Sequence, residues 1–422
     1  MRVLLVSANT EAFQMLSLPL GLACVAAATR KAGHEVAVLD LMFEGNPQAA
    51  IRKLVADFRP DVIGISVRNI DNQDRANPQF LLPAVRAVVR TCRAASHAPL
   101  VVGGAGYSIF PHAALRYLGA DVGIQGEGEM AFPALLEQMT EGKAIGGLPG
   151  VCLPDGAMAE MKPVRPWDDF PLPEPDLWVS HAADRENLWV PVQSRRGCPM
   201  QCSYCSTHLI QGKTRRTRPA EQVVAWLAEL RAAGYRNFAF VDNNFNLPLA
   251  YAKDLCRRII ASGLDVNLWC IVYPKWMDTE LVELMREAGC REVALGFESG
   301  SAPILGSFNK RFTADEVRAV ARLFEAAGIH RRGFLMLGAP GETKATVEES
   351  LAFADSLNLD ALKITLGIRI YPHTALARTA MQEKLIQPDD DLLFPRFYFA
   401  PSLRDWLPER VVAYASSRPW AQ

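Results

Sequence analysis

The sequence predicts two α/β domains in series: an open parallel sheet, then a partial βα barrel with a short C-terminal cap. Short apolar runs alternate with amphipathic segments along most of the 422 residues. Apolar strands separated by helical segments are typical of parallel sheets that helices cover on both faces. One proline-rich stretch interrupts the alternation, and we interpret it as the region between the two domains.

The first alternating series, residues 1–144, predicts a flavodoxin-like domain of the Rossmann type. Its expected strands are the apolar runs 2–7, 35–40, 61–67, 99–104 and 121–126. Segments with helical periodicity accompany them at 20–32, 47–58, 79–95 and 127–140. Because ligands of doubly wound sheets bind at the carboxyl ends of the strands, we expect a ligand at that edge.

Residues 145–188 are expected to form an ordered linker that wraps between the domains. The segment is rich in proline, which fixes φ and limits the freedom of the chain. Its prolines are Pro149, Pro154, Pro163, Pro166, Pro171, Pro173 and Pro175.

The second alternating series, residues 189–385, predicts a partial (β/α)6 barrel of the TIM type. Its expected strands are 189–194, 237–242, 266–272, 292–298, 333–338 and 361–371. The helical segments are 219–233, 249–262, 278–289, 313–327, 343–357 and 375–385. In such barrels the chemistry lies at the carboxyl ends of the strands. The aromatic tail, residues 386–422, is expected to cap the open barrel.

Composition and charge exclude several classes of partner. The formal net charge is −1, so no global field attracts nucleic acid or anionic lipid. The basic run KTRRTR at 213–218 lacks interleaved aromatics and is expected to be a solvated loop or a contact to a carboxylate of a ligand. No signal-peptide pattern or long apolar stretch is seen, so a cytoplasmic monomer without membrane contact is expected.

Three cysteines, Cys198, Cys202 and Cys205, lie together directly after the first barrel strand. Such a set can bind zinc with His208 as a fourth ligand, hold a [4Fe–4S] cluster with one iron left open, or bind no metal. Their spacing favours the cluster without excluding zinc. The other cysteines lie in apolar or helical contexts and are expected in the core: Cys24, Cys92, Cys152, Cys256, Cys270 and Cys290.

The C-x₃-C-x₂-C spacing at the end of the first barrel strand resembles the radical SAM superfamily. The resemblance continues in VDNNFN (241–246), GFESG (296–300), GFLMLGAPGET (333–343) and RIYPHTAL (369–376), each at a strand end. It implies a [4Fe–4S] cluster on the three cysteines, whose open iron binds S-adenosylmethionine. His208 is then a loop residue and not a ligand.

The same resemblance implies a set of residues that bind S-adenosylmethionine. Tyr204 is expected to contact the adenine, and Glu298 and Ser299 the ribose hydroxyls. Gly338 lies where the backbone approaches a ligand closely. The remaining candidates at these strand ends are Asp242, Asn243, Leu337 and Tyr371.

The first domain resembles the cobalamin-binding domain of B12-dependent radical SAM enzymes, through LSLPLGLACVAAATRKAGHEV (16–36), ISVRNIDN (65–72), VVGGAGYS (101–108) and GIQGEGE (123–129). The Asp-x-His-x-x-Gly motif that supplies a histidine to cobalt is absent from the sequence. Cobalamin without a histidine ligand is therefore expected, with an empty relic pocket as the alternative. The implied contacts are Leu18, Asn69, Asp71, Asn72, Gly103, Gly104, Ser108, Gly126, Glu127 and Gly128.

Together the two resemblances imply a radical C-methyltransferase. In such enzymes a 5′-deoxyadenosyl radical removes hydrogen from an unactivated carbon, which then takes the methyl group of methylcobalamin. A non-methylating rearrangement, cyclisation or oxidation is the main alternative, and a non-catalytic cobalamin or metal carrier is a more distant one. The expected partners are a small-molecule or peptide substrate and an electron donor of the flavodoxin or ferredoxin type.

Overall fold

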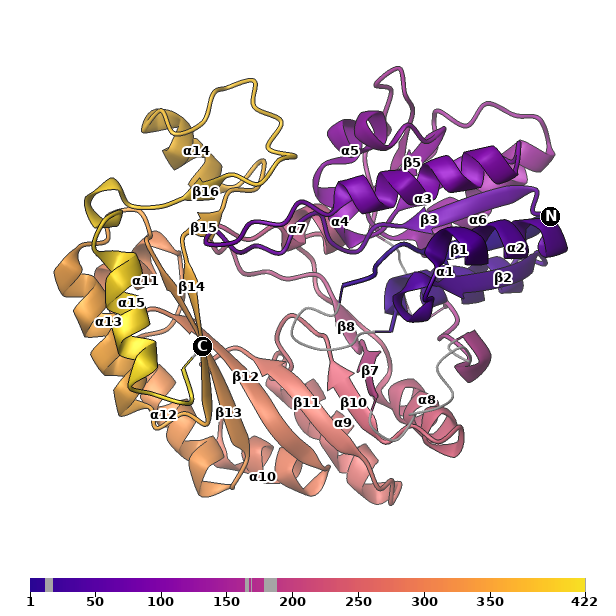
Figure 1. Cartoon of the computed structure of the whole chain (residues 1–422). Helices are drawn as coiled ribbons and strands as arrows, with labels where there is room; N and C mark the ends of the chain where they lie inside the picture. The colour runs from indigo at the N-terminus through magenta and orange to yellow at the C-terminus, as the bar shows by residue number, and fades with distance from the viewer. Residues whose placement is uncertain (12–17, 164–166, 168, 178–187, 422) are drawn as a thin grey trace.

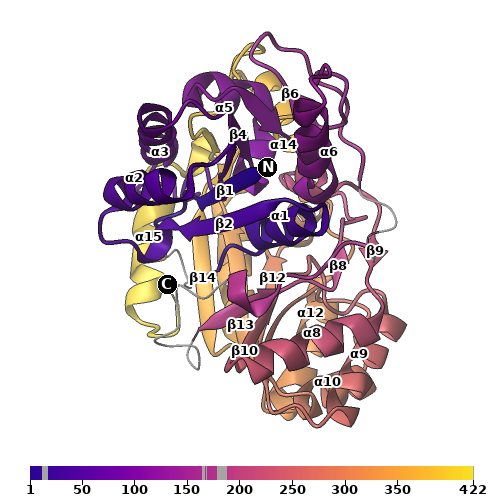
Figure 2. The same cartoon turned by 90° about the vertical axis from the view of Figure 1, so that its right-hand side faces the viewer.

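The computed structural model describes residues 1–11, 18–163, 167, 169–177 and 188–421. Two sheets organise these residues, and the N-terminal domain lies beside the barrel-like domain in both views of the chain (Figure 1 and Figure 2). No helix among the described residues is long and apolar enough to cross a membrane.

The first sheet has the order β2-β1-β3-β4-β5-β6. Its strands are β1 (Arg2–Ser7), β2 (Glu35–Asp40), β3 (Val62–Ser66), β4 (Leu100–Gly103), β5 (Val122–Ile124) and β6 (Val151–Cys152). The first five are parallel, which confirms the flavodoxin-like prediction, and β6 pairs antiparallel with β5. This sixth strand comes from the segment expected to be a linker, part of which (164–166, 168 and 178–187) lies outside the described residues.

Helices cover both faces of this sheet because its strands are apolar on both sides. Along β1, Val3 and Leu5 join the core beneath one set of helices, and Leu4 and Val6 join the core beneath the other. Helix α1 packs against α6 on the first face, and α2 against α3 on the second. The helices are α1 (Leu20–Lys31), α2 (Pro47–Phe58), α3 (Leu82–Ala95), α4 (Ala105–Ile109), α5 (Pro111–Leu118) and α6 (Gly128–Thr140), with the short η1 (Leu41–Phe43).

The second sheet is a six-stranded parallel array in the order β7-β10-β11-β12-β13-β14. These strands are β7 (Trp189–Val192), β10 (Asn237–Phe240), β11 (Asn267–Val272), β12 (Cys290–Glu298), β13 (His330–Leu337) and β14 (Ala361–Leu366). Their connecting helices are α8 (Ala220–Ala232), α9 (Leu249–Ala261), α10 (Thr279–Glu287), α12 (Ala314–Ala326) and α13 (Lys344–Ser356). Because β7 and β14 do not pair, the array is the predicted partial barrel.

Shorter elements lie at the barrel mouth and in the tail. They are β8 (Arg195–Arg196), α7 (Thr207–Gln211), β9 (Arg216–Thr217), α11 (Ala302–Ser307), β15 (Ile368–Arg369), α14 (Ala375–Gln382), β16 (Phe397–Tyr398), η3 (Pro401–Leu403) and α15 (Leu407–Ser416). The strand expected at 361–371 is divided in two, because Gly367 adopts φ 75° between β14 and β15. Strand β15 then pairs antiparallel with β16 of the tail.

The tail returns to the outside of the barrel. Arg410 of α15 forms an ion pair with Glu348 of α13, and Figure 1 shows the two helices side by side. The main-chain carbonyl of Trp420 then accepts a hydrogen bond from the N–H of Leu362, at 2.7 Å. The end of the tail therefore covers the free edge of β14.

Candidate cofactor sites between the two domains

The cysteine loop leaves β7 and reaches the barrel mouth. The Cys198 thiol is buried, and the Cys202 and Cys205 thiols are half-buried. Burial raises the pKa of Cys198 and Cys202, and the charge of Lys310 opposes this shift at Cys202. The Asn244 amide donates to the Cys198 sulfur at 3.5 Å. Three thiols at a partly dry site with a neighbouring cation and an N–H donor fit the thiolate ligands of an iron–sulfur cluster.

The side chain of His208 contacts the backbone of the cysteine loop. Its Nε2 lies 3.0 Å from the carbonyl oxygen of Cys198, and the residue is part of helix α7, where a loop was expected. Among the described residues, no three His, Cys, Asp or Glu side chains gather as a single metal ion requires. The His208 ring is therefore placed against the backbone of the cysteine loop, at the carbonyl of Cys198.

A half-buried triad of Tyr204, Glu298 and Lys310 lies beside the cysteine loop. The Tyr204 hydroxyl donates to Glu298 Oε1 at 3.0 Å, and Lys310 Nζ lies 3.3 Å from the same oxygen. Glu298 reaches this position at the end of β12, where the pairing register with β13 shifts. Burial alone would lower the pKa of Lys310, but Tyr204 and Glu298 hold it well above its ordinary value. Sequence reasoning found the first two residues and missed Lys310.

Other predicted S-adenosylmethionine contacts have their side chains engaged elsewhere. The fully buried carboxylate of Asp242 accepts hydrogen bonds from the N–H groups of Ser194 and Arg195, at 2.8 and 2.9 Å. The Ser299 hydroxyl lies 2.9 Å from that of Ser350. Asp242 therefore holds the chain that leads into the cysteine loop, and Ser299 ties β12 to helix α13.

The remaining candidates lie at the same barrel end in different settings. The Asn243 amide donates to the side chain of Gln211 in α7 at 2.8 Å, and Tyr371 packs near Phe110 of the N-terminal domain. The Leu337 side chain is fully buried in the core, so only its backbone can meet a ligand. Gly338 lies directly beneath the ring of Phe399.

Glu342 is a further buried acid at this strand end that sequence reasoning missed. Its Oε2 accepts the N–H of Gly338 and, at 3.0 Å, that of Ala339. Burial raises its pKa to about 7, although the two hydrogen bonds act in the opposite direction. Its Oε1 is buried without a hydrogen-bond partner in the described part of the chain. The carboxyl group thus stabilises the turn after β13, which the GAPGE stretch forms.

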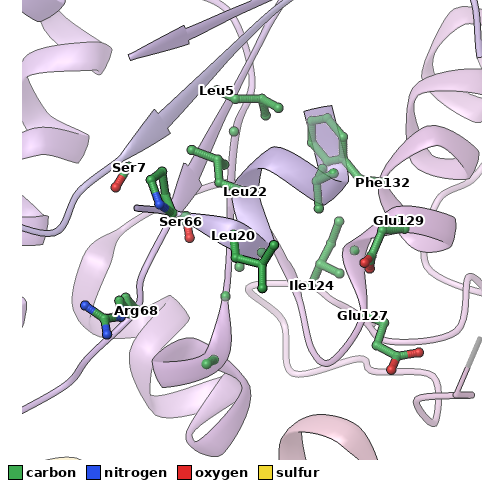
Figure 3. Close-up of a pocket in the computed structure, with 18 of the residues that line it drawn as sticks. Leu5, Ser7, Leu20, Leu22, Ser66, Arg68, Ile124, Glu127, Glu129 and Phe132 are labelled. Atoms are coloured by element: carbon green, nitrogen blue, oxygen red, sulfur yellow. The ribbon is translucent and has the colours of Figure 1, made fainter. Parts of the chain in front are cut away.

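A cavity of about 370 Å³ opens at the carboxyl ends of the first sheet. Figure 3 shows its apolar side chains, including Leu5, Leu22 and Phe132, together with the polar side chains that border it. A Cβ atom on Gly64 would stand 2.6 Å from Leu5 and 3.3 Å from Phe132, so this glycine keeps the apolar part open. An apolar slot with a polar border at this edge fits a large, partly aromatic cofactor.

Six of the ten predicted cobalamin contacts line this cavity, namely Leu18, Gly103, Gly104, Gly126, Glu127 and Gly128. Four do not. Asn69 borders a small separate pocket, and Asp71 forms an ion pair with Arg369. The Asn72 side chain accepts an N–H group of its own loop. The Ser108 hydroxyl donates to the carbonyl oxygen of Gly104 and accepts the N–H of Gly126. The cavity is instead bordered by residues at the ends of β1 and β3 that were missed: Ser7, Asn9, Ser66 and Arg68.

The cavity also reaches the barrel domain. Pro191, Gln193 and Arg196 contribute to its wall, as does Gln211 of helix α7. None of its lining residues is a histidine. The wall thus joins the ends of the first sheet to the segment that carries the cysteines.

Buried ion pairs hold the two domains together at this cavity. Arg216 binds both oxygens of Glu127, at 2.6 and 2.7 Å, and Arg196 binds Glu129 at 2.5 Å. These four side chains are at most 7% exposed. Burial raises the pKa of Glu129, but the charge and hydrogen bond of Arg196 outweigh it and hold the pKa below its ordinary value. The KTRRTR run is therefore only partly a solvated loop, because Lys213, Thr214 and Thr217 are exposed while Arg216 and Arg218 are buried.

Comparison with known proteins finds a family match in each of the two domains. Residues 192–354 match the radical SAM superfamily, and residues 7–136 match the B12 binding domain. An uncharacterized methyltransferase of Pyrococcus horikoshii is 28% identical over 87% of this chain and 79% of its own length. The tryptophan 2-C-methyltransferase of Streptomyces laurentii is 25% identical over 86% of this chain and 72% of its own length.

Solved structures share the whole fold. The radical SAM methyltransferase TsrM of Kitasatospora setae, solved with tryptophan and a SAM analogue, superposes with a TM-score of 0.86 at 23% identity, covering 98% of this chain and 88% of TsrM. The cobalamin-dependent radical enzyme OxsB has a TM-score of 0.80 at 16% identity, covering 99% and 66% of the two chains.

Fold, cysteine loop and cavity together define a radical SAM enzyme with a B12-binding domain. The chain thus combines a radical SAM domain with a B12 binding domain, the pair of domains that fits the cobalamin-dependent radical SAM enzymes. Its cofactors are a [4Fe–4S] cluster, S-adenosylmethionine and cobalamin.

Proposed function

We propose that this enzyme transfers a methyl group to a carbon atom of a small molecule. The observation that carries the proposal is the cavity at the first sheet, whose wall includes the segment that leads into the cysteine loop. Relatives over most of the chain are named methyltransferases, and the two family matches occur in this order along the chain. When bound, the cofactors supply a 5′-deoxyadenosyl radical and a transferable methyl group.

The chain's own residues orient the reacting groups and exclude water. Cys198, Cys202 and Cys205 would hold the cluster, and the triad of Tyr204, Glu298 and Lys310 would face S-adenosylmethionine. The cavity glycines and the apolar slot would hold cobalamin without a histidine ligand. The ion pairs Glu127–Arg216 and Glu129–Arg196 would fix the spacing between the two cofactor sites.

We further propose a small-molecule substrate over a peptide, and an electron donor of the flavodoxin or ferredoxin type. A small molecule is favoured because one of the methyltransferase relatives is named for tryptophan and another for a cytidylyl-hydroxyethylphosphonate. We also propose that the enzyme acts as a cytoplasmic monomer, with a first domain over 1–144 and a barrel over 189–385.

Isotope labelling tests the reaction. Reconstituted enzyme, a reductant and methyl-labelled S-adenosylmethionine are incubated with the low-molecular-weight fraction of a cell extract. Methyl transfer predicts a labelled small molecule together with 5′-deoxyadenosine and S-adenosylhomocysteine, and the labelled product and 5′-deoxyadenosine should be absent with Cys202→Ala. 5′-Deoxyadenosine accompanied by a modified but unlabelled product would instead indicate a cyclisation, rearrangement or oxidation.

A further inference from the structure

Two polar side chains contact sulfur atoms of the cysteine loop. Asn244, in the turn after β10, donates its amide to Cys198 Sγ at 3.5 Å. Thr207, the first residue of helix α7, has its hydroxyl oxygen 3.2 Å from Cys205 Sγ. Both residues are half-buried. The contacts come from different parts of the barrel mouth, and each reaches a sulfur that is predicted to hold the cluster.

The direction of each hydrogen bond follows from the form of the cysteines that binds iron. A cluster ligand is a thiolate, and a thiolate has no proton to donate. The hydroxyl of Thr207 can donate or accept, so it donates to the Cys205 sulfur in that form. The amide N–H of Asn244 is a donor throughout. Both side chains therefore direct the positive end of an N–H or O–H dipole at a sulfur ligand.

The turn that carries Asn244 is fixed to the segment that carries Cys198. Arg195 Nη1 donates to the carbonyl oxygens of Asn244 and Leu247, both at 3.1 Å. Arg195 is 2% exposed and precedes Cys198 by three residues. The N–H of Leu247 also donates to the Asn244 carbonyl oxygen, at 3.2 Å. The backbone of Asn244 is thus held where its amide meets the sulfur.

A second connection joins the same two segments through helix α7. Gln211 Oε1 accepts the N–H of Gly197 at 3.2 Å and the side-chain amide of Asn243 at 2.8 Å. Gly197 directly precedes Cys198, and Asn243 directly precedes Asn244. One oxygen atom therefore holds both sides of the Asn244–Cys198 contact, as is typical of residues that orient the ligands of a metal centre.

Donors at these sulfurs affect how easily the cluster is reduced. Reduction adds one electron, which the proposed donor of the flavodoxin or ferredoxin type loses, so the cluster and its sulfur ligands become more negative. Hydrogen bonds to the sulfurs are among the factors that set the reduction potential of iron–sulfur clusters. A dipole whose positive end points at the sulfur stabilises the more negative, reduced state more than the oxidised state.

Resting on the proposed assignment of the three cysteines to the cluster, we propose that Asn244 and Thr207 raise its reduction potential. Asn244 acts through Cys198 and Thr207 through Cys205, so both are positioning residues. They set how readily the enzyme accepts the electron that is needed before a 5′-deoxyadenosyl radical can form.

A redox titration of the reconstituted enzyme, followed by EPR, tests the proposal. At the solution potential at which the native cluster is half reduced, the ratio of reduced to oxidised cluster should be about tenfold lower in Asn244→Leu and in Thr207→Val. For a one-electron couple, this ratio corresponds to a shift of about 59 mV to more negative potential. Thr207→Ser keeps the hydroxyl group and should retain the native potential.

Asn309→Gly is the matched control for Asn244→Leu. The Asn309 amide binds the same loop at 2.7 Å, but at the carbonyl oxygen of Gln201 instead of a sulfur. Glycine suits its φ of 54°, and the variant should have the native potential. A native potential in Asn244→Leu or in Thr207→Val overturns the proposal for that residue, and an equal fall in the control overturns it for Asn244.

Pulsed EPR of the native enzyme gives a test of Asn244 that needs no variant. With asparagine labelled with ¹⁵N at the side-chain amide, the reduced cluster should show a weak coupling to a ¹⁵N nucleus, and its absence overturns the role of Asn244. Failure of Thr207→Val to bind four irons would give that hydroxyl a structural role and overturn its redox role. A native enzyme without iron and sulfide would instead contradict the assignment of the cysteines, which is a separate result.

Discussion

Arg216 of the barrel domain binds both carboxylate oxygens of Glu127 in the first domain, at 2.6 and 2.7 Å. Beside this pair, Arg196 binds Glu129, and Arg196 precedes the first cluster cysteine by two residues. All four side chains are buried, so removal of one partner leaves a charge without compensation. The relative position of the two cofactor sites therefore depends on these ion pairs.

The first prediction concerns Glu129→Gln. The variant leaves the buried Arg196 without its closest acid, and we expect a loss of about 3–5 kcal/mol in unfolding free energy. Urea unfolding followed by circular dichroism measures it. The matched control is Glu137→Gln, on an exposed turn of the same helix α6, with an expected change below about 0.5 kcal/mol. Equal stability of the two variants would show that the ion pairs do not hold the domains.

The second prediction concerns the cluster. Anaerobic reconstitution should give about four irons and four sulfides per chain, and the triple alanine variant of Cys198, Cys202 and Cys205 should lose both together. Cys92→Ala, which alters a buried thiol in the first domain, should retain them. Tightly bound zinc without labile sulfide would contradict the assignment.

The sheets and most helices could be predicted because their signal is local. Apolar runs placed the strands, and α12 follows its N-cap Thr313, which forms a capping box with Glu316. The errors lie where residues far apart in the sequence determine the local structure. Helix α3 begins at Leu82 instead of 79, because Phe80 pairs with Asp71 at the base of the loop 71–80. The short β6 forms because it pairs with the edge strand β5.

Less of the site could be predicted, since proximity in space has no local signal. Glu127, expected to contact cobalamin, lines the cavity, and its carboxylate binds Arg216, 89 positions later. Lys310 reaches Glu298 through the turn after α11, and no motif marks it. Arg68 lies in the quoted ISVRNIDN stretch, directly before the residues chosen from it, Asn69, Asp71 and Asn72. It lines the cavity, and they do not.

The third prediction concerns the axial ligand of cobalt. Because no histidine lines the cavity, the EPR spectrum of the cob(II)alamin form should lack superhyperfine splitting from an axial nitrogen. The spectrum should be unchanged in His112→Gln, the variant of a histidine that instead contacts the Cys152 sulfur at 3.4 Å. A clear nitrogen splitting would require a ligand that the cavity wall does not contain.

The fourth prediction is a pH dependence that originates at Glu342. Burial raises the pKa of this carboxyl group from 4.5 to about 7, so the folded state keeps a proton that the unfolded state releases at lower pH. The folded state therefore binds more protons between these two values, and stability falls as the pH rises through them. Between pH 5 and pH 8 the group should cost the native enzyme ~2.5 kcal/mol.

Glu342→Gln removes this titration and keeps a side-chain oxygen that can accept the N–H groups of Gly338 and Ala339. The free energy of unfolding, from urea titrations at pH 5 and pH 8, should therefore decline less in the variant than in the native enzyme. Glu349→Gln, on the exposed face of helix α13, should show the native pH dependence. If all three proteins decline equally with pH, Glu342 is ionised throughout this range, and its unpartnered oxygen must then reach a cation or water.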